Sequence, residues 1–327
     1  MKLIIQIPCF NEDSVLPATL NDLPQAIDGI DEIEVLVVDD GSTDNTALLA
    51  RECGVDHVLS LKKHHGLARA FFAGIESCIE LGADIIVNTD ADNQYSGGDI
   101  HKLVEPILSG EAEVVVGDRQ IYKVAHFSFF KKILQKIGSA FVRKLSNTNV
   151  EDVVSGFRAY SRKAAMHINI ITDFSYTVEN LIQLGTSRFK IVTVPVKTNV
   201  TERKSRLHKG IVHFIINQIR TIIRSYSMYK ALKVFSFIGL VFLLPGLFLG
   251  LRFVYFFIYD PPSAGGHVQS LILAAVLIIL SFIFLMLGIL ADLISSNRKL
   301  IERVLLYSRQ QKYDKDEGKD SSKYSDK

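Results

Sequence analysis

Two long, nearly uncharged runs close to the carboxyl end constrain the fold of this chain most. One covers residues 234–259 and is interrupted only by Arg252, and the other covers residues 268–294 and is interrupted only by Asp292. A helix of about 20 apolar residues is long enough to cross the hydrocarbon core of a bilayer. A single run of this kind could instead form a buried core helix, but two in tandem favour a membrane hairpin. We therefore expect two transmembrane helices with these bounds.

The basic residues around these runs predict the orientation of the hairpin. They flank it on both outer sides, whereas the connection at residues 260–267 contains no Lys or Arg (outer basic residues: Lys230, Lys233, Arg298, Lys299, Arg303). The positive-inside rule then places both flanks in the cytoplasm. The amino-terminal MKLIIQIP lacks the long apolar core of a signal peptide, so we expect a cytoplasmic catalytic domain and tail. The tail, residues 308–327, is rich in mixed charges, and we expect it to be disordered.

The region before the hairpin alternates between two patterns. Short β-branched runs predict strands, and amphipathic stretches predict helices (strands at 2–7, 34–38, 57–61, 85–88, 113–117 and 190–196; helices at 14–29, 66–81, 99–109 and 174–185). Such alternation indicates an α/β fold with a doubly wound, mostly parallel sheet flanked by helices. The three cysteines form no CxxC pair, which favours packed thiols in a reducing compartment. We place this domain at residues 1–206.

Two carboxylates follow the strand at residues 85–88. Asp90 and Asp92 are spaced i, i+2, so in an extended segment they point to the same side. Carboxylates this close repel each other unless a cation lies between them, and Mg²⁺ or Mn²⁺ prefers such oxygen ligands. Gln94 is a candidate for a further oxygen ligand. An isolated pair of this kind is more often a solvated acidic loop, so the neighbouring strand ends decide.

Polar residues also follow the first two strands. Pro8, Asn11 and Glu12 come after the first strand, and the run from Asp39 to Asp44 follows the second, with Gly41 suited to a tight turn. The carboxyl ends of parallel strands meet at one edge of a sheet, where ligands bind in open α/β folds. The three segments therefore predict one site.

Five motifs in order, IPCFNE, VVDDGSTDNT, NTDADNQY, VVGDR and DVVSGFRAYSR, resemble those of family-2 glycosyltransferases with the GT-A fold. The similarity covers roughly residues 3–206 and is strongest to the polyprenyl-phosphate sugar synthases, such as dolichyl-phosphate mannose synthases. It implies a membrane-anchored, inverting hexosyltransferase that moves a sugar from a nucleoside-diphosphate sugar to dolichyl or undecaprenyl phosphate. The sugar and the nucleotide, UDP or GDP, are left open.

The resemblance also implies donor-side roles. Pro8, Asn11 and Glu12 would border the nucleotide, and Asp39 and Asp40 would contact the base and ribose. Asp90, Asp92 and Gln94 would hold Mg²⁺ or Mn²⁺ on the donor diphosphate. Family members usually have Leu or Met before that glutamine and His-Pro-Pro after it, whereas this chain has Asn93 before it and Tyr95-Ser96-Gly97-Gly98 after it. The departure bears on the identity of the sugar.

Two residues are candidates for catalytic groups. Arg119 follows the predicted strand at 113–117 and would stabilise the leaving diphosphate, with a salt bridge to Asp118 as the alternative. The resemblance places Asp152 near the acceptor phosphate, where it has either a catalytic role as a general base or an orienting role. A phosphate acceptor is already ionised near neutral pH, so it needs a base less than a hydroxyl acceptor does.

Basic residues are candidates for the acceptor side. The resemblance places Ser155 and Arg158 near the acceptor phosphate. The loop with Arg203, Lys204 and Arg206 suits a phosphate clamp or a lipid-headgroup contact, and its place before the hairpin argues against a nucleic-acid patch. Basic amphipathic helices are predicted at about 126–145 and at 207–233, on the membrane surface or, for the first, packed on the core.

Other functions remain possible from the sequence. A processive polysaccharide synthase normally carries a Gln-x-x-Arg-Trp motif, and this chain contains no Trp. A different membrane lipid or glycan acceptor, or a non-catalytic GT-A scaffold for a membrane glycan pathway, would also use this fold. A scaffold would not require Asp90, Asp92, Asp152 and the basic residues together. A homo-oligomer is left open.

Overall fold

The computed structural model describes residues 1–120, 139–140, 142–143, 146, 148–170, 176–199, 231–259 and 268–323. It divides into two compact units, Met1–Ile222 with Leu305–Lys327, and Ile223–Val304, and each is considered by itself. The predicted helix at 126–145 lies mostly outside the described residues. The basic loop with Arg203, Lys204 and Arg206, and nearly all of 207–233, also lie outside them.

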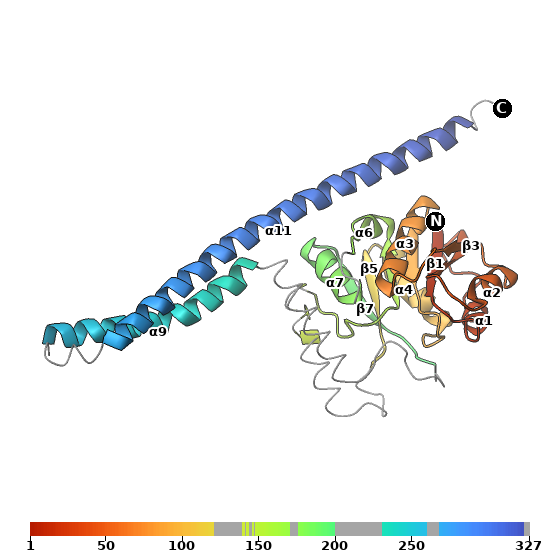
Figure 1. Cartoon of the computed structure of the whole chain (residues 1–327). Helices are drawn as coiled ribbons and strands as arrows, with labels where there is room; N and C mark the ends of the chain where they lie inside the picture. Colours follow the sequence, from red (N-terminus) through yellow and green to blue (C-terminus); the bar gives the residue numbers. More distant parts are fainter. Residues whose placement is uncertain are drawn as a thin grey trace. The chain divides into compact units, whose positions relative to one another are not determined.

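The first unit is built on a seven-stranded sheet with the order β3-β2-β1-β4-β6-β5-β7 (Figure 1). Its strands are β1 Lys2–Cys9, β2 Glu32–Asp39, β3 His57–Ser60, β4 Ile85–Asn88, β5 Val114–Asp118, β6 Arg158–Ser161 and β7 Ile191–Pro195. β6 runs antiparallel to β4 and β5, and the other pairs are parallel. The predicted mostly parallel α/β sheet is confirmed. The antiparallel strand β6 itself was not predicted, because its sequence RAYS contains no apolar β-branched run.

Helices cover both faces of this sheet. They are α1 Leu16–Asn21, α2 Thr46–Glu52, α3 Leu67–Glu80, α4 Ile100–Leu108 with the 3₁₀ turn η1 Gly97–Asp99 before it, α6 Arg162–Met166 and α7 Tyr176–Thr186. Alternate residues of β1 enter different cores: Ile5 packs in one with α1 and α4, and Ile4 in the other with α3, α6 and α7. The helix predicted at 14–29 is too long, because Pro24 cannot continue it.

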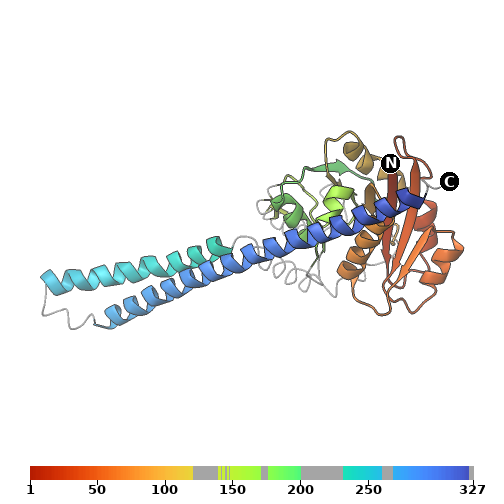
Figure 2. The ribbon, with the colours of Figure 1, turned by 90° about the horizontal axis from the view of Figure 1, so that it is seen from above.

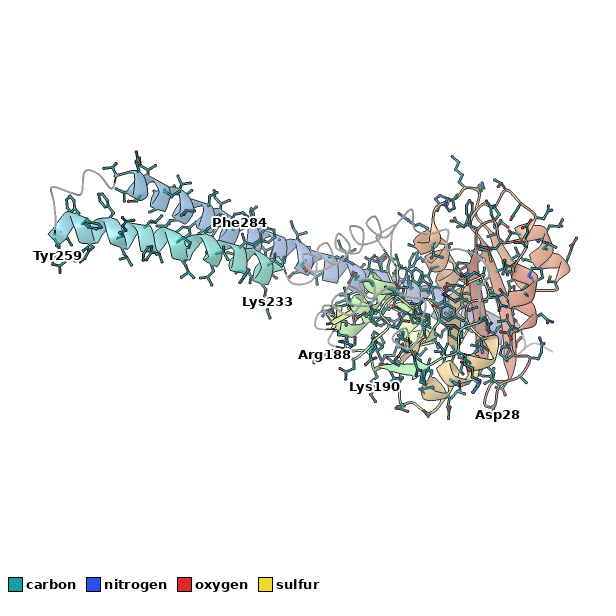
Figure 3. The ribbon with its side chains drawn as sticks, turned by 90° about the horizontal axis from the view of Figure 1, so that it is seen from below. Asp28, Arg188, Lys190, Lys233, Tyr259 and Phe284 are labelled. Carbon is teal, nitrogen blue, oxygen red and sulfur yellow. The ribbon has the colours of Figure 1, made fainter. Side chains whose placement is uncertain are left out.

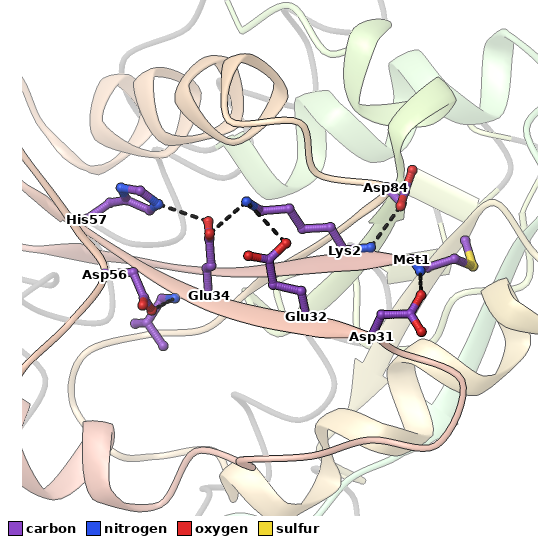
Figure 4. Close-up of polar contacts among 9 residues, drawn as sticks. Met1, Lys2, Asp31, Glu32, Glu34, Asp56, His57 and Asp84 are labelled. Carbon is purple, nitrogen blue, oxygen red and sulfur yellow. Dashed lines mark hydrogen bonds and ion pairs between the residues drawn. The ribbon is translucent and has the colours of Figure 1, made fainter. Parts of the chain in front are cut away.

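A polar network fastens the amino ends of β1, β2 and β3 (Figure 4). The Lys2 ammonium lies 2.7 Å from Glu34, whose other carboxylate oxygen lies 2.9 Å from the His57 ring. Burial alone would raise the pKa of Glu34, but the hydrogen bonds from Lys2 and His57 outweigh it and lower that pKa. The backbone N–H of Lys2 also donates to Asp84, just before β4, at 2.8 Å. The network thus ties four strands at the edge opposite to their carboxyl ends.

The second unit consists of two long helices that lie side by side in both views (Figures 1 and 2). They are α9 Ala231–Tyr259 and the larger part of α11 Val268–Lys323, and both are long and apolar enough to cross a membrane. Phe242 of α9 stacks on Phe284 of α11 with ring centroids 5.5 Å apart. Large apolar side chains point outward from both helices (Figure 3). This arrangement agrees with the expected hairpin and suggests membrane anchoring.

The carboxyl-terminal tail differs from its prediction. Residues 308–323, expected to be disordered, continue α11 as helix. The cost of nucleating a helix is met once, so a helix already formed over the apolar run extends into polar sequence at little further cost.

Candidate active site

Strand register brings the predicted donor-side segments to one edge of the sheet. Cys9 of β1 pairs with Asp39 of β2, and Gln6 of β1 pairs with Asn88 of β4. The segments that follow these strands therefore leave the sheet side by side. They carry the residues that the sequence singled out on the donor side, which are Pro8, Asn11, Glu12, Asp39, Asp40, Asp90, Asp92 and Gln94.

The loops after β1 and β2 are joined by hydrogen bonds. The backbone N–H of Asn11 donates to Ser42 Oγ at 2.9 Å, and its side-chain Oδ1 accepts the Thr43 N–H at 2.8 Å. The N–H of Glu12 donates to Thr46 Oγ1 at 2.8 Å. Gly41 has φ +70°, and a Cβ there would lie 2.6 Å from the backbone carbon of Lys63, so glycine is required in this turn. The two loops form one rigid wall of the site.

Asp40 anchors a third loop to this wall. Its carboxylate is buried and accepts the backbone N–H groups of His65 and Gly66 at 2.8 and 2.7 Å, and it lies 2.8 Å from the His64 ring. His64 in turn stacks on the half-exposed Phe10, with ring centroids 3.8 Å apart. This aromatic pair was not predicted, although the convergence of segments at strand ends also applies to the segment after β3.

Asp90 is the most perturbed carboxylate of the site. Burial, and then repulsion by Asp92, raise its pKa to about 7, although Arg119 and Arg158 act in the opposite direction. Asp92 is exposed, and its Oδ1 accepts the Gln94 N–H at 3.1 Å. Two repelling carboxylates, with Gln94 close by in sequence as a candidate oxygen ligand, fit a hard divalent ion, which would relieve the repulsion. Among the described residues, no group of three or more His, Cys, Asp or Glu lies together as a metal site.

β6 determines what faces Asp90. Asn88 of β4 and Val116 of β5 both pair with Arg158, the first residue of β6. The chain that precedes β6, residues 152–157, therefore passes between the ends of β4 and β5. It separates Asp90 from Arg119 along the edge of the sheet, and we call it the acceptor-side loop.

Arg119 and Asp152 form a bidentate ion pair. Arg119 Nε donates to Asp152 Oδ2 at 2.7 Å, and Nη2 donates to Oδ1 at 2.9 Å. Asp152 is only 2% exposed, whereas 17% of the Arg119 side chain is accessible. The alternative salt bridge with Asp118 is therefore not the one observed. Each of the two oxygens of Asp152 accepts a hydrogen bond from the Arg119 guanidinium, which favours its orienting role.

Ser155 and Arg158 are fully buried. The Arg158 guanidinium donates to three backbone carbonyls, those of Ser155, Thr177 and Val153, each at 2.9 Å. Two of these carbonyls, those of Ser155 and Val153, belong to the acceptor-side loop, so Arg158 holds the main chain of this loop in place. Its predicted contact with an acceptor phosphate stays a prediction, as does that of Ser155.

Comparison with known proteins decides the family. The sequence profile described as "Glycosyl transferase family 2" matches residues 4–168, half of the chain. The chain belongs to glycosyltransferase family 2. It is 31% identical to the undecaprenyl-phosphate mannosyltransferase of Micrococcus luteus, over 65% of this chain and 90% of that protein. It is 30% identical to the UDP-N-acetylglucosamine–dolichyl-phosphate N-acetylglucosaminyltransferase of Methanococcus voltae, over 62% and 87% respectively.

A solved structure confirms the fold of this family 2 glycosyltransferase. Glucosyl-3-phosphoglycerate synthase from Mycobacterium tuberculosis, in complex with Mn²⁺, UDP and glucosyl-3-phosphoglycerate, superposes with a TM-score of 0.53. The similarity covers 69% of this chain and 78% of that one at 19% identity. The GT-A fold and the enzyme class expected from the motifs are thus confirmed. The two relatives are named for different sugars, so their names do not decide the sugar here.

Proposed function

We propose that this family 2 glycosyltransferase moves a sugar from a nucleoside-diphosphate sugar to a polyprenyl phosphate, with inversion, at a membrane surface. The observation that carries the proposal is that Arg119, which Asp152 holds through two hydrogen bonds, is near enough to Asp90 to act on the pKa of its carboxyl. Both relatives above are named for polyprenyl-phosphate acceptors. The two apolar helices fit an enzyme whose acceptor is a membrane lipid.

Each group of the site would have one task in this reaction. A bound Mg²⁺ or Mn²⁺, held by Asp90, Asp92 and Gln94, would neutralise charge on the leaving diphosphate. Arg119 would stabilise the same developing charge, and Asp152 would keep the guanidinium in position. An acceptor phosphate oxygen would bond to the anomeric carbon as the bond to the donor diphosphate breaks. The bonding electrons leave with the nucleoside diphosphate, and an ionised acceptor has no proton to lose.

We expect the loop with Arg203, Lys204 and Arg206 to bind the acceptor phosphate. Arg158 is fully buried and already donates to three backbone carbonyls, so an acceptor phosphate would have to enter a buried place to reach it. A charge-assisted hydrogen bond contributes about 1.5–3 kcal/mol, so Arg206→Ala should weaken acceptor use about tenfold or more. Donor affinity should stay near that of wild type. If donor binding collapses while the acceptor response stays normal, the basic loop belongs to the nucleotide site.

The proposed function is tested by assaying the purified protein in vesicles that contain polyprenyl phosphate. A panel of UDP- and GDP-sugars should reveal one donor whose sugar is transferred in the presence of Mg²⁺ or Mn²⁺. Excess EDTA and Asp92→Asn should each abolish transfer, with Glu32→Gln, on the opposite edge of the sheet, as the matched control. Full activity in EDTA, or a near-wild-type Asp92→Asn, would refute the metal site. If the donor is hydrolysed, or its sugar is transferred, at the same rate without polyprenyl phosphate, the proposed acceptor is wrong.

A further inference from the structure

The segment that follows the two aspartates is attached to the chain after β7. The Asn199 N–H donates to the Gln94 carbonyl at 2.8 Å, and Tyr95 and Thr198 form an antiparallel β-bridge. The Ser96 N–H also reaches the Lys197 carbonyl, at 3.4 Å. We call residues 90–96, which carry the predicted metal ligands, the metal turn. Its main chain is therefore bonded to the segment that leads, in sequence, into the basic loop.

The Tyr95 side chain connects the same turn to the acceptor-side loop. It is 3% exposed, and its ring stacks on Phe157 with centroids 4.8 Å apart and planes inclined by 20°. Its hydroxyl accepts the Gly156 N–H at 3.2 Å and lies 3.5 Å from Ser155 Oγ. One side chain thus contacts three consecutive residues of the acceptor-side loop.

Gly156 is the point where this loop meets Asp90. A Cβ on Gly156 would lie 2.9 Å from Asp90 Oδ1 and 2.8 Å from the Tyr176 hydroxyl, so the backbone itself borders the Asp90 carboxylate. The Gly156 carbonyl accepts a hydrogen bond from Asn88 Nδ2 at 2.8 Å. Asn88 therefore fixes one side of this residue, and the Tyr95 hydroxyl fixes the other.

We propose that Tyr95 is a positioning residue that holds the metal turn and the acceptor-side loop in register. Its hydroxyl keeps Gly156 against Asp90, and the same loop begins with Asp152, which orients Arg119. This role rests on the proposed function, because it concerns how donor and acceptor are aligned for transfer.

The test uses Tyr95→Phe, which keeps the aromatic stack and removes only the hydroxyl. Ser161→Ala is the matched control, because Ser161 Oγ also accepts a backbone N–H at 3.2 Å, from Ala164. Ser161 pairs with Ile85, at the other end of β4 from Asp90. Each variant therefore loses a hydrogen bond from a backbone N–H to a hydroxyl, and Tyr95→Phe, which also loses the longer contact with Ser155, loses it beside the site.

Two quantities are measured well below the unfolding temperature. The first is the affinity for Mn²⁺ in the presence of UDP or GDP, followed by the electron paramagnetic resonance of free Mn²⁺, which needs no turnover. The second is the division of any loss of transfer between kcat and acceptor KM. Tyr95→Phe should weaken Mn²⁺ binding three- to tenfold and lower kcat about tenfold, as expected for one lost hydrogen bond. Ser161→Ala should leave both unchanged.

Mn²⁺ affinity in Tyr95→Phe equal to that of Ser161→Ala would overturn the positioning role, whatever happens to the unfolding temperature. The binding arm does not depend on the acceptor. If the wild type fails to use polyprenyl phosphate, the proposed acceptor is wrong, while the comparison of Mn²⁺ affinities still decides the role of Tyr95.

Discussion

Asp152 is connected to the site by its ion pair with Arg119. Both of its carboxylate oxygens accept hydrogen bonds from the guanidinium, and it is almost fully buried. These two hydrogen bonds tie the position of Asp152 to that of the guanidinium. Its contribution should therefore depend on the presence of Arg119.

A double-mutant cycle tests this dependence. Asp152→Asn should lower kcat by about 10- to 100-fold, the size expected when a charge-assisted pair is broken. In an Arg119→Ala background the same change should have little effect, or should even help, because it removes an unpaired buried charge. The measurement is kcat for the four proteins at saturating donor. A full second loss from Asp152→Asn without Arg119 would identify Asp152 as a base acting on its own.

At the scale of strands and helices, the opposite edge of the sheet offers a test of stability. Glu34 is 15% exposed and pairs with Lys2 and His57, whereas Glu32 is 56% exposed and lies 3.6 Å from Lys2. Glu34→Gln should destabilise the protein by about 1–3 kcal/mol at pH 7, and Glu32→Gln by less than about 1 kcal/mol.

The pH dependence of this effect follows from the lowered pKa of Glu34. A carboxyl whose pKa is lower in the folded state stabilises the fold above its unfolded pKa, about 4.3, and loses that contribution as the pH falls through the folded value. The gap between wild type and Glu34→Gln should therefore close below about pH 4. Urea unfolding followed by circular dichroism at pH 7, 5 and 3.5 measures it. A gap that persists unchanged at pH 3.5 would contradict the ion-pair explanation.

The strands and the meeting of their ends were predictable because they follow from local patterns and one rule of parallel sheets. β1, β2 and β4 each end in polar residues, and register alone brings those together. β6 was not predictable in the same way, since its sequence RAYS has no apolar β-branched run and its place depends on pairing with β4 and β5. The Arg119–Asp152 pair and the burial of Arg158 both follow from that insertion, so the sequence could name these residues but not their partners.

At the scale of the whole molecule, the end of α11 contributes to the catalytic unit. Arg309 Nη1 donates to the carbonyls of Met166 and Ile168 at 3.0 and 2.9 Å, and Nη2 lies 3.1 Å from Glu76. Its guanidinium also lies over the Phe72 ring, 5.4 Å from the centroid. The chain that follows the second apolar run is therefore grouped with the residues that precede the first. If the two apolar runs cross a membrane, this grouping agrees with an even number of crossings between them.

The last prediction concerns this topology. If both runs span the membrane, the catalytic unit and the carboxyl terminus lie on one side, and the basic flanks place that side in the cytoplasm. Protease added to sealed inside-out vesicles should remove a tag at the carboxyl terminus, and right-side-out vesicles should protect it. A tag placed in the connection at 260–267 is the control, and it should give the reverse pattern. Cleavage of the carboxyl-terminal tag in right-side-out vesicles alone would reverse the orientation, and cleavage of both tags from one side would mean that the two runs do not form a spanning hairpin.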